Sequence, residues 1–122
     1  MQNTDNCPVE ATLGLIGGKY KALILWHLSE GILRFSELRK AVTGATPKML
    51  TQQLRELEAN NLIHREVFPV IPPKVEYSLT ELGKSLMPVL VAMRDWGAEY
   101  LHRQNLESCC FMIKKDPIPG TN

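Results

Sequence analysis

Cysteine is scarce in this 122-residue sequence, and long apolar runs are absent from it. Its three cysteines are too few, and two are too close together, for the disulfide framework of a small secreted domain. No apolar run approaches the roughly 18 residues that indicate a membrane span, and the opening MQNTDNC lacks the basic and apolar segments of a secretion signal. We therefore expect reduced thiols, no membrane contact and a cytoplasmic location.

A large excess of charge is also missing, since the formal net charge is +1. The charges are unevenly distributed, because six basic but only two acidic side chains lie between Lys19 and Lys48. A basic face on a nearly neutral protein is compatible with nucleic-acid binding, although ordinary solvated helix faces would give the same distribution. The hydrophobic content of 44% and the length suit one globular domain.

The first part of the chain predicts two helices. Pro8 suits the first helical position, with Cys7 as the cap, and Gly17 with Gly18 ends this helix. A second helix, from about Lys19 to Ser29, is apolar on most sides. A helix with that pattern is expected to lie at the centre of the core.

The next segment has the organisation of a helix-turn-helix. A short helix is expected with Ser36 as its cap, followed by a glycine-containing turn at 43–45. A longer helix begins at Thr46 and Pro47 and ends at Asn60-Asn61, since asparagine tolerates the left-handed conformation found after helices.

This longer helix carries two opposed stripes. Leu50, Leu54 and Leu57 share one face, at helical spacing. The nearly opposite face is polar and consists of Lys48, Thr51, Gln52 and Arg55. Gln and Arg side chains make bidentate hydrogen bonds to purine edges in the major groove, while the other two suit phosphates near the helix start. The alternative is an ordinary solvated helix face.

Two alternating segments follow, at 63–68 and 74–79, with three prolines between them. They predict a projecting hairpin, with Lys74 and the rigid Pro72-Pro73 tip placed to contact a neighbouring groove or its phosphates. The fold class is therefore mainly α with a small β-hairpin, an α+β winged helix-turn-helix with N- and C-terminal dimerisation helices. The expected DNA-contacting residues are Arg34, Ser36, Thr46, Pro47, Lys48, Thr51, Gln52, Arg55 and Lys74. For several of these, surface solubility alone is the competing explanation.

The last helical region is expected to begin at Thr80, to break near Met87 and to continue from Pro88 to about Arg103. Its second piece carries an apolar stripe that exceeds what a winged helix needs for its own core, although the same stripe could belong to a monomer core. We expect a homodimer through this helix and the first one. The predicted interface comprises Val9, Leu13, Leu90, Met93, Trp96, Gly97, Tyr100 and Leu101.

These patterns predict a simple domain organisation. Residues 1–6 form a flexible N-terminus, 7–103 a winged helix-turn-helix domain for DNA binding and dimerisation, and 104–122 a partly disordered C-terminal tail.

Cys7 is a candidate sensor of oxidants or electrophiles, because it stands at a helix start near the chain end. The alternative is a small apolar residue packed under the dimer helices. Cys109 and Cys110 with His102 give three irregularly spaced ligands, so no metal site is expected. No nucleophile triad, glycine-rich phosphate loop or paired-carboxylate motif is present, so we expect neither an enzyme nor a bound cofactor.

Several motifs together suggest a known family: CPVEATLGLIGGKYK from Cys7, ILWHL from Ile24, RFSEL from Arg34, TPKMLTQQLRELEANNLIHREV from Thr46 and PPKVEYSLTELGKSL from Pro72. From Cys7 to about Tyr100 the chain resembles the HxlR-type winged helix-turn-helix regulators of bacteria. The resemblance implies a dimeric DNA-binding fold, a recognition helix at 46–60 and a wing at 72–74. It also implies that Cys7 occupies a position that some members use to sense oxidants or electrophiles such as quinones and aldehydes.

The chain departs from the family in two ways. Tyr20 stands where many members have tryptophan, which is expected to change packing and not function. The winged-helix body has no second cysteine, so a disulfide within one chain has no partner there. A disulfide between Cys7 residues of two copies, a mixed disulfide or alkylation remains open.

The expected function is that of a sequence-specific transcriptional regulator that binds a pseudo-palindromic operator in double-stranded DNA as a homodimer and lies on the nucleoid when bound. A small-molecule or oxidant effector stays unidentified. Two alternatives remain: a winged-helix protein-interaction module, and a metal- or ligand-gated regulator without thiol sensing. An interaction module would not need the polar stripe that contains Gln52 and Arg55.

Overall fold

The computed structural model describes residues 6–106. The chain separates into two compact units, Met1–Met87 and Pro88–Asn122, and each is described by itself. The expected flexible N-terminus at 1–6 and tail at 104–122 lie almost wholly outside the described residues, as do Cys109 and Cys110.

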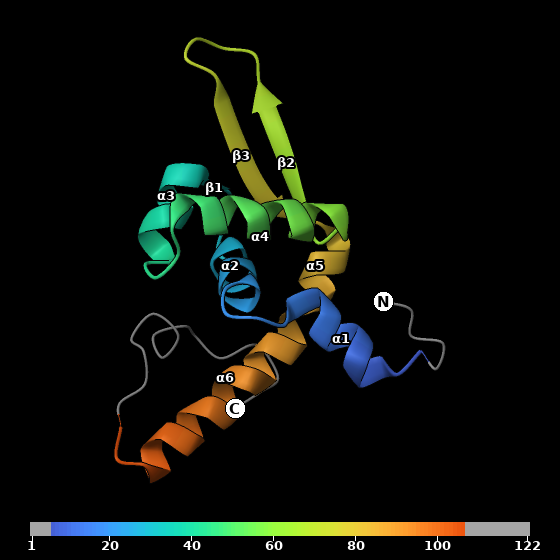
Figure 1. Ribbon diagram of the computed structural model, residues 1–122, viewed down its shortest axis with the longest axis vertical. Helices are drawn as coiled ribbons and strands as arrows, with labels where there is room; N and C mark the ends of the chain where they lie inside the picture. The colour runs from blue at the N-terminus through green and yellow to red at the C-terminus, as the bar shows by residue number, and fades with distance from the viewer. Residues whose placement is uncertain (1–5, 107–122) are drawn as a thin grey trace. The chain divides into compact units, whose positions relative to one another are not determined.

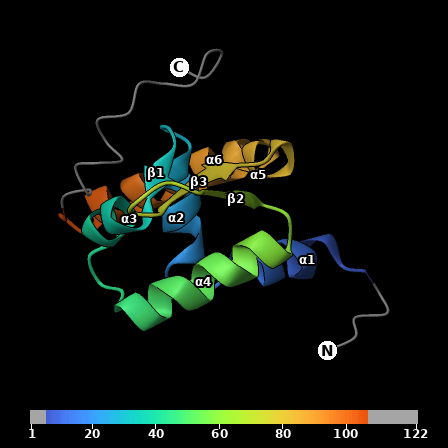
Figure 2. The same ribbon diagram turned by 90° about the horizontal axis from the view of Figure 1, so that it is seen from above.

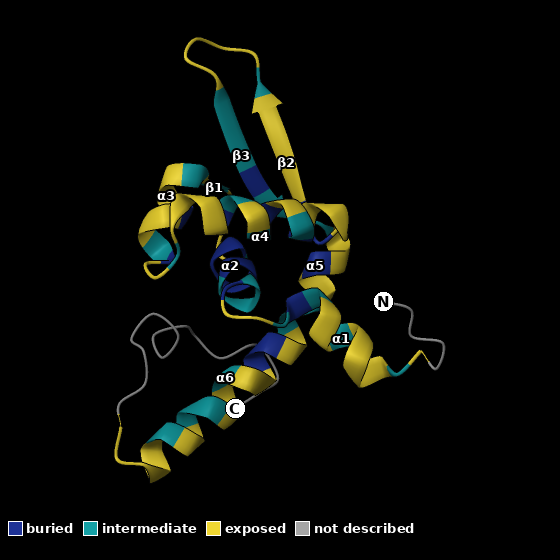
Figure 3. Ribbon diagram, viewed as in Figure 1, coloured by how far each residue is buried: buried dark blue, intermediate teal, exposed yellow. Residues whose placement is uncertain are grey.

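The first unit is built around one buried helix (Figure 1). Its elements are α1 (Pro8–Ile16), α2 (Lys21–Leu28), β1 (Leu33–Arg34), α3 (Phe35–Ala41), α4 (Pro47–Ala59), β2 (Ile63–Phe68), β3 (Lys74–Leu79) and α5 (Glu81–Ser85). Helix α2 packs against α1, α3, α4 and β3. Its Ile24, Leu25 and Trp26 are fully buried, as the dark segment at the centre of Figure 3 shows. The prediction of a central core helix is therefore confirmed, although it begins two residues later than expected.

The start of α3 differs from the sequence-based prediction. Arg34, and not Ser36, is the cap residue, and its backbone N–H donates to Oε1 of Glu37 at 2.8 Å. Arg34 also pairs with Glu76 across the sheet. Because that pairing keeps Arg34 extended, the helix begins directly after it and places the exposed Ser36 within its first turn. The prediction that Ser36 caps this helix is wrong.

The sheet has three antiparallel strands in the order β1-β3-β2. The sequence predicted β2 and β3 with their observed bounds but missed β1, which is only two residues long and is defined by its pairing with β3. Arg65 pairs with Tyr77 and Val67 with Val75. Since paired residues share one face of a sheet, these four side chains lie on the face of the buried Tyr77. The two long strands project well beyond α4 as a wing (Figure 1).

Local capping explains where α4 begins and ends. The Thr46 hydroxyl accepts a hydrogen bond from the N–H of Met49 at 3.1 Å, and Pro47 occupies the first helical position. Asn61 follows the helix with φ of 61°, the left-handed conformation that asparagine tolerates. Both predicted ends of this helix are confirmed.

The turn that joins β3 to α5 is tied to the turn that joins α4 to β2. The Thr80 hydroxyl accepts from the N–H of Gly83 at 3.0 Å and donates to the carbonyl of Asn61 at 2.7 Å. Thr80 therefore caps α5 as predicted. Gly83 lies so close to the Leu62 carbonyl that a Cβ built on it would overlap the oxygen. Only glycine fits this position without displacing one of the two backbones.

Of the second unit, the structure describes residues 88–106, most of which belong to α6 (Met87–Arg103), with Pro88 in the first turn of this helix. Along this helix Trp96 and Tyr100 are exposed, and their rings stack with centroids 5.5 Å apart. Among residues 6–106, no helix combines the length and apolar character that crossing a bilayer requires.

Candidate nucleic-acid interface

Helix α4 is fixed in rotation by its apolar face. Leu50, Leu54 and Leu57 are 0–2% exposed, and full burial of a leucine side chain contributes about 1.5–3 kcal/mol. Turning the helix about its axis would expose all three leucines. The opposite face, with Lys48, Gln52 and Arg55, is consequently held towards solvent, and the three residues are exposed.

The structure brings most of the predicted contact residues onto one side of the first unit. Thr46 and Pro47 are exposed at the start of α4, and Thr51 is half-buried on the flank of this helix that faces the wing. Arg34 and Ser36 are exposed at the start of α3. Figure 2, from above, shows α4 running along one side of the unit.

Lys74 stands apart from this group. Its ammonium lies 4.6 Å from the centre of the Phe68 ring and 3.7 Å from a carboxylate oxygen of Glu76. These residues occupy the face of the wing opposite to Tyr77, because they are out of step with it in the strand register. Lys74 is thus part of the wing and does not lie with the predicted contact residues of α4.

The loop at the end of the wing is apolar. Ile71 is completely exposed and Val70 is half exposed. No charged residue occurs between Glu66 and Lys74. The wing therefore presents hydrocarbon at its tip, and Lys74, where β3 begins, is the first cation after the tip.

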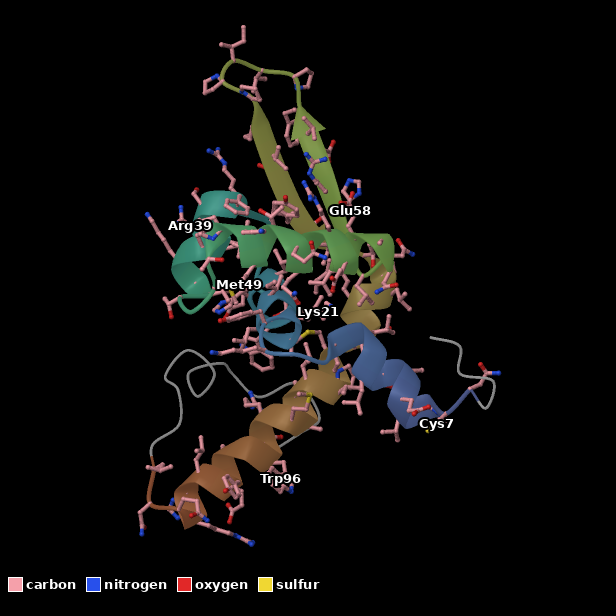
Figure 4. The ribbon with its side chains drawn as sticks, in the orientation of Figure 1. Cys7, Lys21, Arg39, Met49, Glu58 and Trp96 are labelled. Carbon is pink, nitrogen blue, oxygen red and sulfur yellow. The ribbon has the colours of Figure 1, made fainter. Side chains whose placement is uncertain are left out.

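A polar hollow of about 330 Å³ separates α4 from the wing, lined by Thr51, Leu54, Arg55, Glu58, Arg65 and Tyr77. Figure 4 shows Glu58 on the part of α4 nearest the strands. Arg65 was absent from the candidates drawn from the sequence. The available signal was the alternation of β2, which puts this charged side chain on the same face as the apolar Ile63 and Val67.

Helix α3 adds positive charge beside α4. Arg39 and Lys40 are exposed in its last turn, and Figure 4 shows Arg39 at that end of the unit. The sequence marked them as part of a basic stretch but not as individual candidates. Their exposure extends the basic surface from α4 across α3.

An ion pair links α4 to the core helix. Oε1 of Glu56 lies 2.5 Å from the ammonium of Lys21, and Oε2 accepts from the side-chain amide of Gln52 at 2.7 Å. The hydrogen bond from Lys21, then that from Gln52, then the charge of Lys21 hold the pKa of Glu56 below that of an ordinary glutamate. Glu56 is therefore ionised at neutral pH, and its charge is compensated by Lys21.

The predicted dimer residues fall into three groups by exposure. Val9 and Leu13 on α1 are 67% and 60% exposed. On α6, Met93, Trp96 and Tyr100 are exposed, whereas Gly97 and Leu101 are half-buried. Leu90 is buried, so its side chain is not part of the exposed apolar surface of this helix.

Cys7 is the cap residue of α1, and its half-buried thiol is in no disulfide. It contributes to an open hollow of about 470 Å³, lined by Asn6, Cys7, Glu10, Ala11, Leu13, Gly14, Leu15 and Asn60. Figure 4 shows Cys7 at the start of this helix. Within residues 6–106, no group of three or more His, Cys, Asp or Glu side chains is placed to hold a metal ion.

Comparison with known proteins gives a consistent result. A sequence model of the HxlR-like helix-turn-helix family matches residues 15–105. The chain is 56% identical over 99 residues to the HTH-type transcriptional regulator YdeP of Bacillus subtilis, which covers 81% of this chain and 77% of YdeP.

Solved structures agree with the sequence relatives. The redox regulator HypR in its oxidized form superposes with a TM-score of 0.72 at 53% identity, covering 75% of this chain and 94% of HypR. The HTH-type transcriptional regulator ytcD superposes with a TM-score of 0.75 at 52% identity, covering 79% and 98% of the two chains.

Proposed function

This chain belongs to the HxlR-like helix-turn-helix family and is a DNA-binding transcriptional regulator, and from that premise we propose that it acts as a homodimer on a pseudo-palindromic operator. The observation that carries the proposal is the exposed face of α4, on which Lys48, Gln52 and Arg55 lie opposite three buried leucines. Such a helix can enter the major groove while its other face stays in the core. A regulator of this kind works at the nucleoid, in the cytoplasm.

The residues of α4 divide by their chemistry. Gln52 and Arg55 reach base edges, because their planar groups form paired hydrogen bonds with purines. Lys48, Thr51 and the Thr46–Pro47 start of the helix contact phosphates, which position the protein without reading sequence. Arg34 and Ser36 at the start of α3 also contact the DNA backbone. Lys74 contacts it from the edge of the wing.

The hollow between α4 and the wing suits the DNA backbone. One strand of the DNA separates the major groove entered by α4 from the minor groove contacted by the wing. The backbone of that DNA strand passes between α4 and the wing. Arg65 faces that passage on the wing side, together with Thr51 on the helix side. The apolar Val70–Pro73 tip then packs on sugars in the adjacent minor groove.

The homodimer is supported by apolar side chains left on the surface of α1 and α6. On α1, Val9 and Leu13 are 67% and 60% exposed, and on α6, Trp96 and Tyr100 are 71% and 49% exposed. Large apolar side chains that lie together on a surface mark interaction sites. A twofold dimer presents two copies of α4 about 34 Å apart, one turn of B-form DNA. This geometry requires an operator with two inverted half-sites.

Cys7 makes the regulator responsive to oxidants or electrophiles. Its thiol is partly exposed in an open hollow at the start of α1, and the similar protein HypR is named a redox regulator. A two-electron oxidant converts the Cys7 thiols of two copies to one disulfide and releases two protons. A mixed disulfide or alkylation also modifies the Cys7 thiol, at the start of α1 in each copy. Each of these modifications alters the spacing of the two copies of α4.

The decisive experiment selects bound fragments of genomic DNA with the purified protein and measures affinity for the selected sequence and a scrambled version. The proposal expects inverted half-sites and a clear preference for the matched sequence. Arg55→Ala is expected to reduce that preference by roughly a hundredfold, as for the loss of one base-reading pair in each of the two half-sites. Arg103→Ala, an exposed arginine on α6, is the control. An unchanged preference in Arg55→Ala would remove this residue from base reading, and no preference in the unaltered protein would sink the proposal.

A further inference from the structure

Three side chains connect the buried helix α2 to the exposed face of α4. Lys21 on α2 is 12% exposed, and its ammonium meets Oε1 of Glu56. The second oxygen of this carboxylate accepts from Nε2 of Gln52, one helical turn earlier on α4, at 2.7 Å. Figure 4 shows Lys21 beneath α4, on the helix at the centre of the unit. The connection therefore starts from a rigid element and ends at a residue proposed to read a base.

The contact to Glu56 decides how the Gln52 amide is oriented. A side-chain amide has one acceptor oxygen and an NH₂ group with two hydrogens. Turning the amide by half a rotation would set its oxygen against the carboxylate of Glu56, where both groups are acceptors. Glu56 is ionised, since its pKa is lowered by Lys21 and Gln52, so this repulsion persists at neutral pH.

The oriented amide keeps one N–H and its oxygen for a partner outside the protein. Side by side, an acceptor and a donor match adenine, which offers the N6 hydrogen and the N7 acceptor in the major groove. Guanine offers two acceptors at the same edge, and thymine offers one acceptor and a methyl group. An amide that turns freely can present its NH₂ group to the acceptors of guanine or thymine, and it would then not distinguish adenine from these bases.

We propose that Glu56, held by Lys21, is a positioning residue that fixes the Gln52 amide and thereby makes Gln52 select adenine at one base pair of each half-site. The inference rests on the proposed function and adds a specificity-determining residue that does not itself touch DNA. Glu56 is acidic and lies on the helix that enters the groove. Its pairing with Lys21 keeps this negative charge from acting as an unpaired repulsive charge beside the phosphates.

The simpler alternative is that the Gln52–Glu56 contact only stabilises the helix, as pairs four residues apart do. The two explanations differ in what is lost when Glu56 is removed. A helix-stabilising pair would change affinity for all DNA sequences together. A positioning residue would change the preference at one base pair and leave the others unaltered.

The test measures the relative affinities of operator variants, with each base pair of one half-site changed in turn, for four proteins. These are the unaltered chain, Glu56→Ala, Gln52→Ala and the double variant. We expect Glu56→Ala to lose roughly tenfold of the preference for adenine at one base pair, the same base pair at which Gln52→Ala loses its preference. In the Gln52→Ala background, Glu56→Ala is expected to change no preference.

Two further variants separate charge from positioning. Glu58→Ala removes the same charge from the same helix, and its effect is expected to leave the preference at the Gln52 base pair intact. Lys21→Met keeps the length of the side chain and removes the partner of Glu56, and it is expected to weaken the same preference. A thermal unfolding midpoint for each variant checks that the fold is retained.

The proposal is overturned if Glu56→Ala leaves the preference unaltered, shifts it at base pairs other than that of Gln52, or still shifts it when Gln52 is already alanine. A selective effect of Glu58→Ala at the Gln52 base pair would overturn it as well. These outcomes are distinct from failure of the proposed function, in which the unaltered protein would itself show no preference among operator variants.

Discussion

The phenolic hydroxyl of Tyr20 donates a hydrogen bond to the carbonyl oxygen of Gly44 at 2.8 Å. Tyr20 is buried at the start of α2, and Gly44 lies in the turn between α3 and α4. The bond therefore ties the core helix to the turn that sets the angle between the two helices of the helix-turn-helix. A tryptophan, which the family resemblance implies at this position, would place an indole N–H instead of this hydroxyl.

Tyr20→Phe tests the importance of this bond. We expect the free energy of unfolding to fall by about 0.5–1.5 kcal/mol, the usual contribution of one hydrogen bond. The lower end is favoured because Gly44 is exposed and water can replace the hydroxyl. Urea unfolding of the variant and of the unaltered chain measures the change. Equal stability of the Tyr20 variant and the parent would mean that the bond contributes nothing.

Lys48→Ala tests the phosphate contacts proposed for α4. Each neutralised phosphate contributes about 0.9 to the slope of log affinity against log salt concentration. Because each of the two copies in the homodimer loses one contact, we expect the slope to fall by about 1.8 in Lys48→Ala, while the ratio of affinities for matched and scrambled operators stays constant. Binding titrations at several salt concentrations measure both quantities.

The control for the salt experiment is Lys84→Ala. Lys84 is exposed on α5 and pairs with Glu81 at 3.3 Å, away from the face of α4. Its removal lowers the net charge by the same amount and is expected to leave the slope unchanged. If both variants reduce the slope equally, the effect is one of net charge and not of a contact made by Lys48.

Gly83→Ala tests the close approach between α5 and the turn that follows α4. The added Cβ overlaps the Leu62 carbonyl, so we expect a loss of about 1–3 kcal/mol, as for other overpacking substitutions. Gly14→Ala on α1 is the control, because a Cβ added to Gly14 has no atom within 4 Å. That control is expected to be neutral or slightly stabilising, because alanine favours helix more than glycine does. Comparable effects of the two variants would contradict the close packing at Gly83.

Trp96→Ala tests the dimer. Trp96 is 71% exposed, so its removal should not affect folding of the chain itself. If it lies in the interface, truncation of this aromatic side chain is expected to cost at least about 2 kcal/mol of association. That cost corresponds to dissociation at roughly 30-fold higher protein concentration. Sedimentation velocity over a dilution series measures it, with the exposed His102→Ala on the same helix as control.

Cys7→Ser tests thiol sensing. We expect a thiol oxidant such as diamide to change operator affinity of the unaltered protein and to leave Cys7→Ser unaffected, because a serine hydroxyl does not form a disulfide. The matched control replaces both Cys109 and Cys110 by serine and is expected to respond like the parent. A response that persists in Cys7→Ser would assign sensing to another residue.

Much of the fold follows from local sequence. Pro8, Thr46 and Thr80 mark helix starts, since each satisfies or avoids an unpaired N–H in the first turn. The alternation within residues 63–68 and 74–79 gives both long strands, because successive side chains of a strand point to opposite faces of the sheet. The cap of α3 was misplaced, since what keeps Arg34 extended is its pairing with Glu76, some 40 residues along the chain.

The candidate interface divides in the same way. The opposed stripes of α4 were visible in the sequence, because helical periodicity alone determines which residues share a face. The position of Arg65 across the hollow from α4 and the ion pair of Lys21 with Glu56 were not visible, since each joins residues from different elements. Periodicity and capping act within one turn of helix or one pair of strands, so the sequence by itself determined the helices, the strands and the polar face. Which charges meet across elements depends on how those elements pack, and only the tertiary structure decided that.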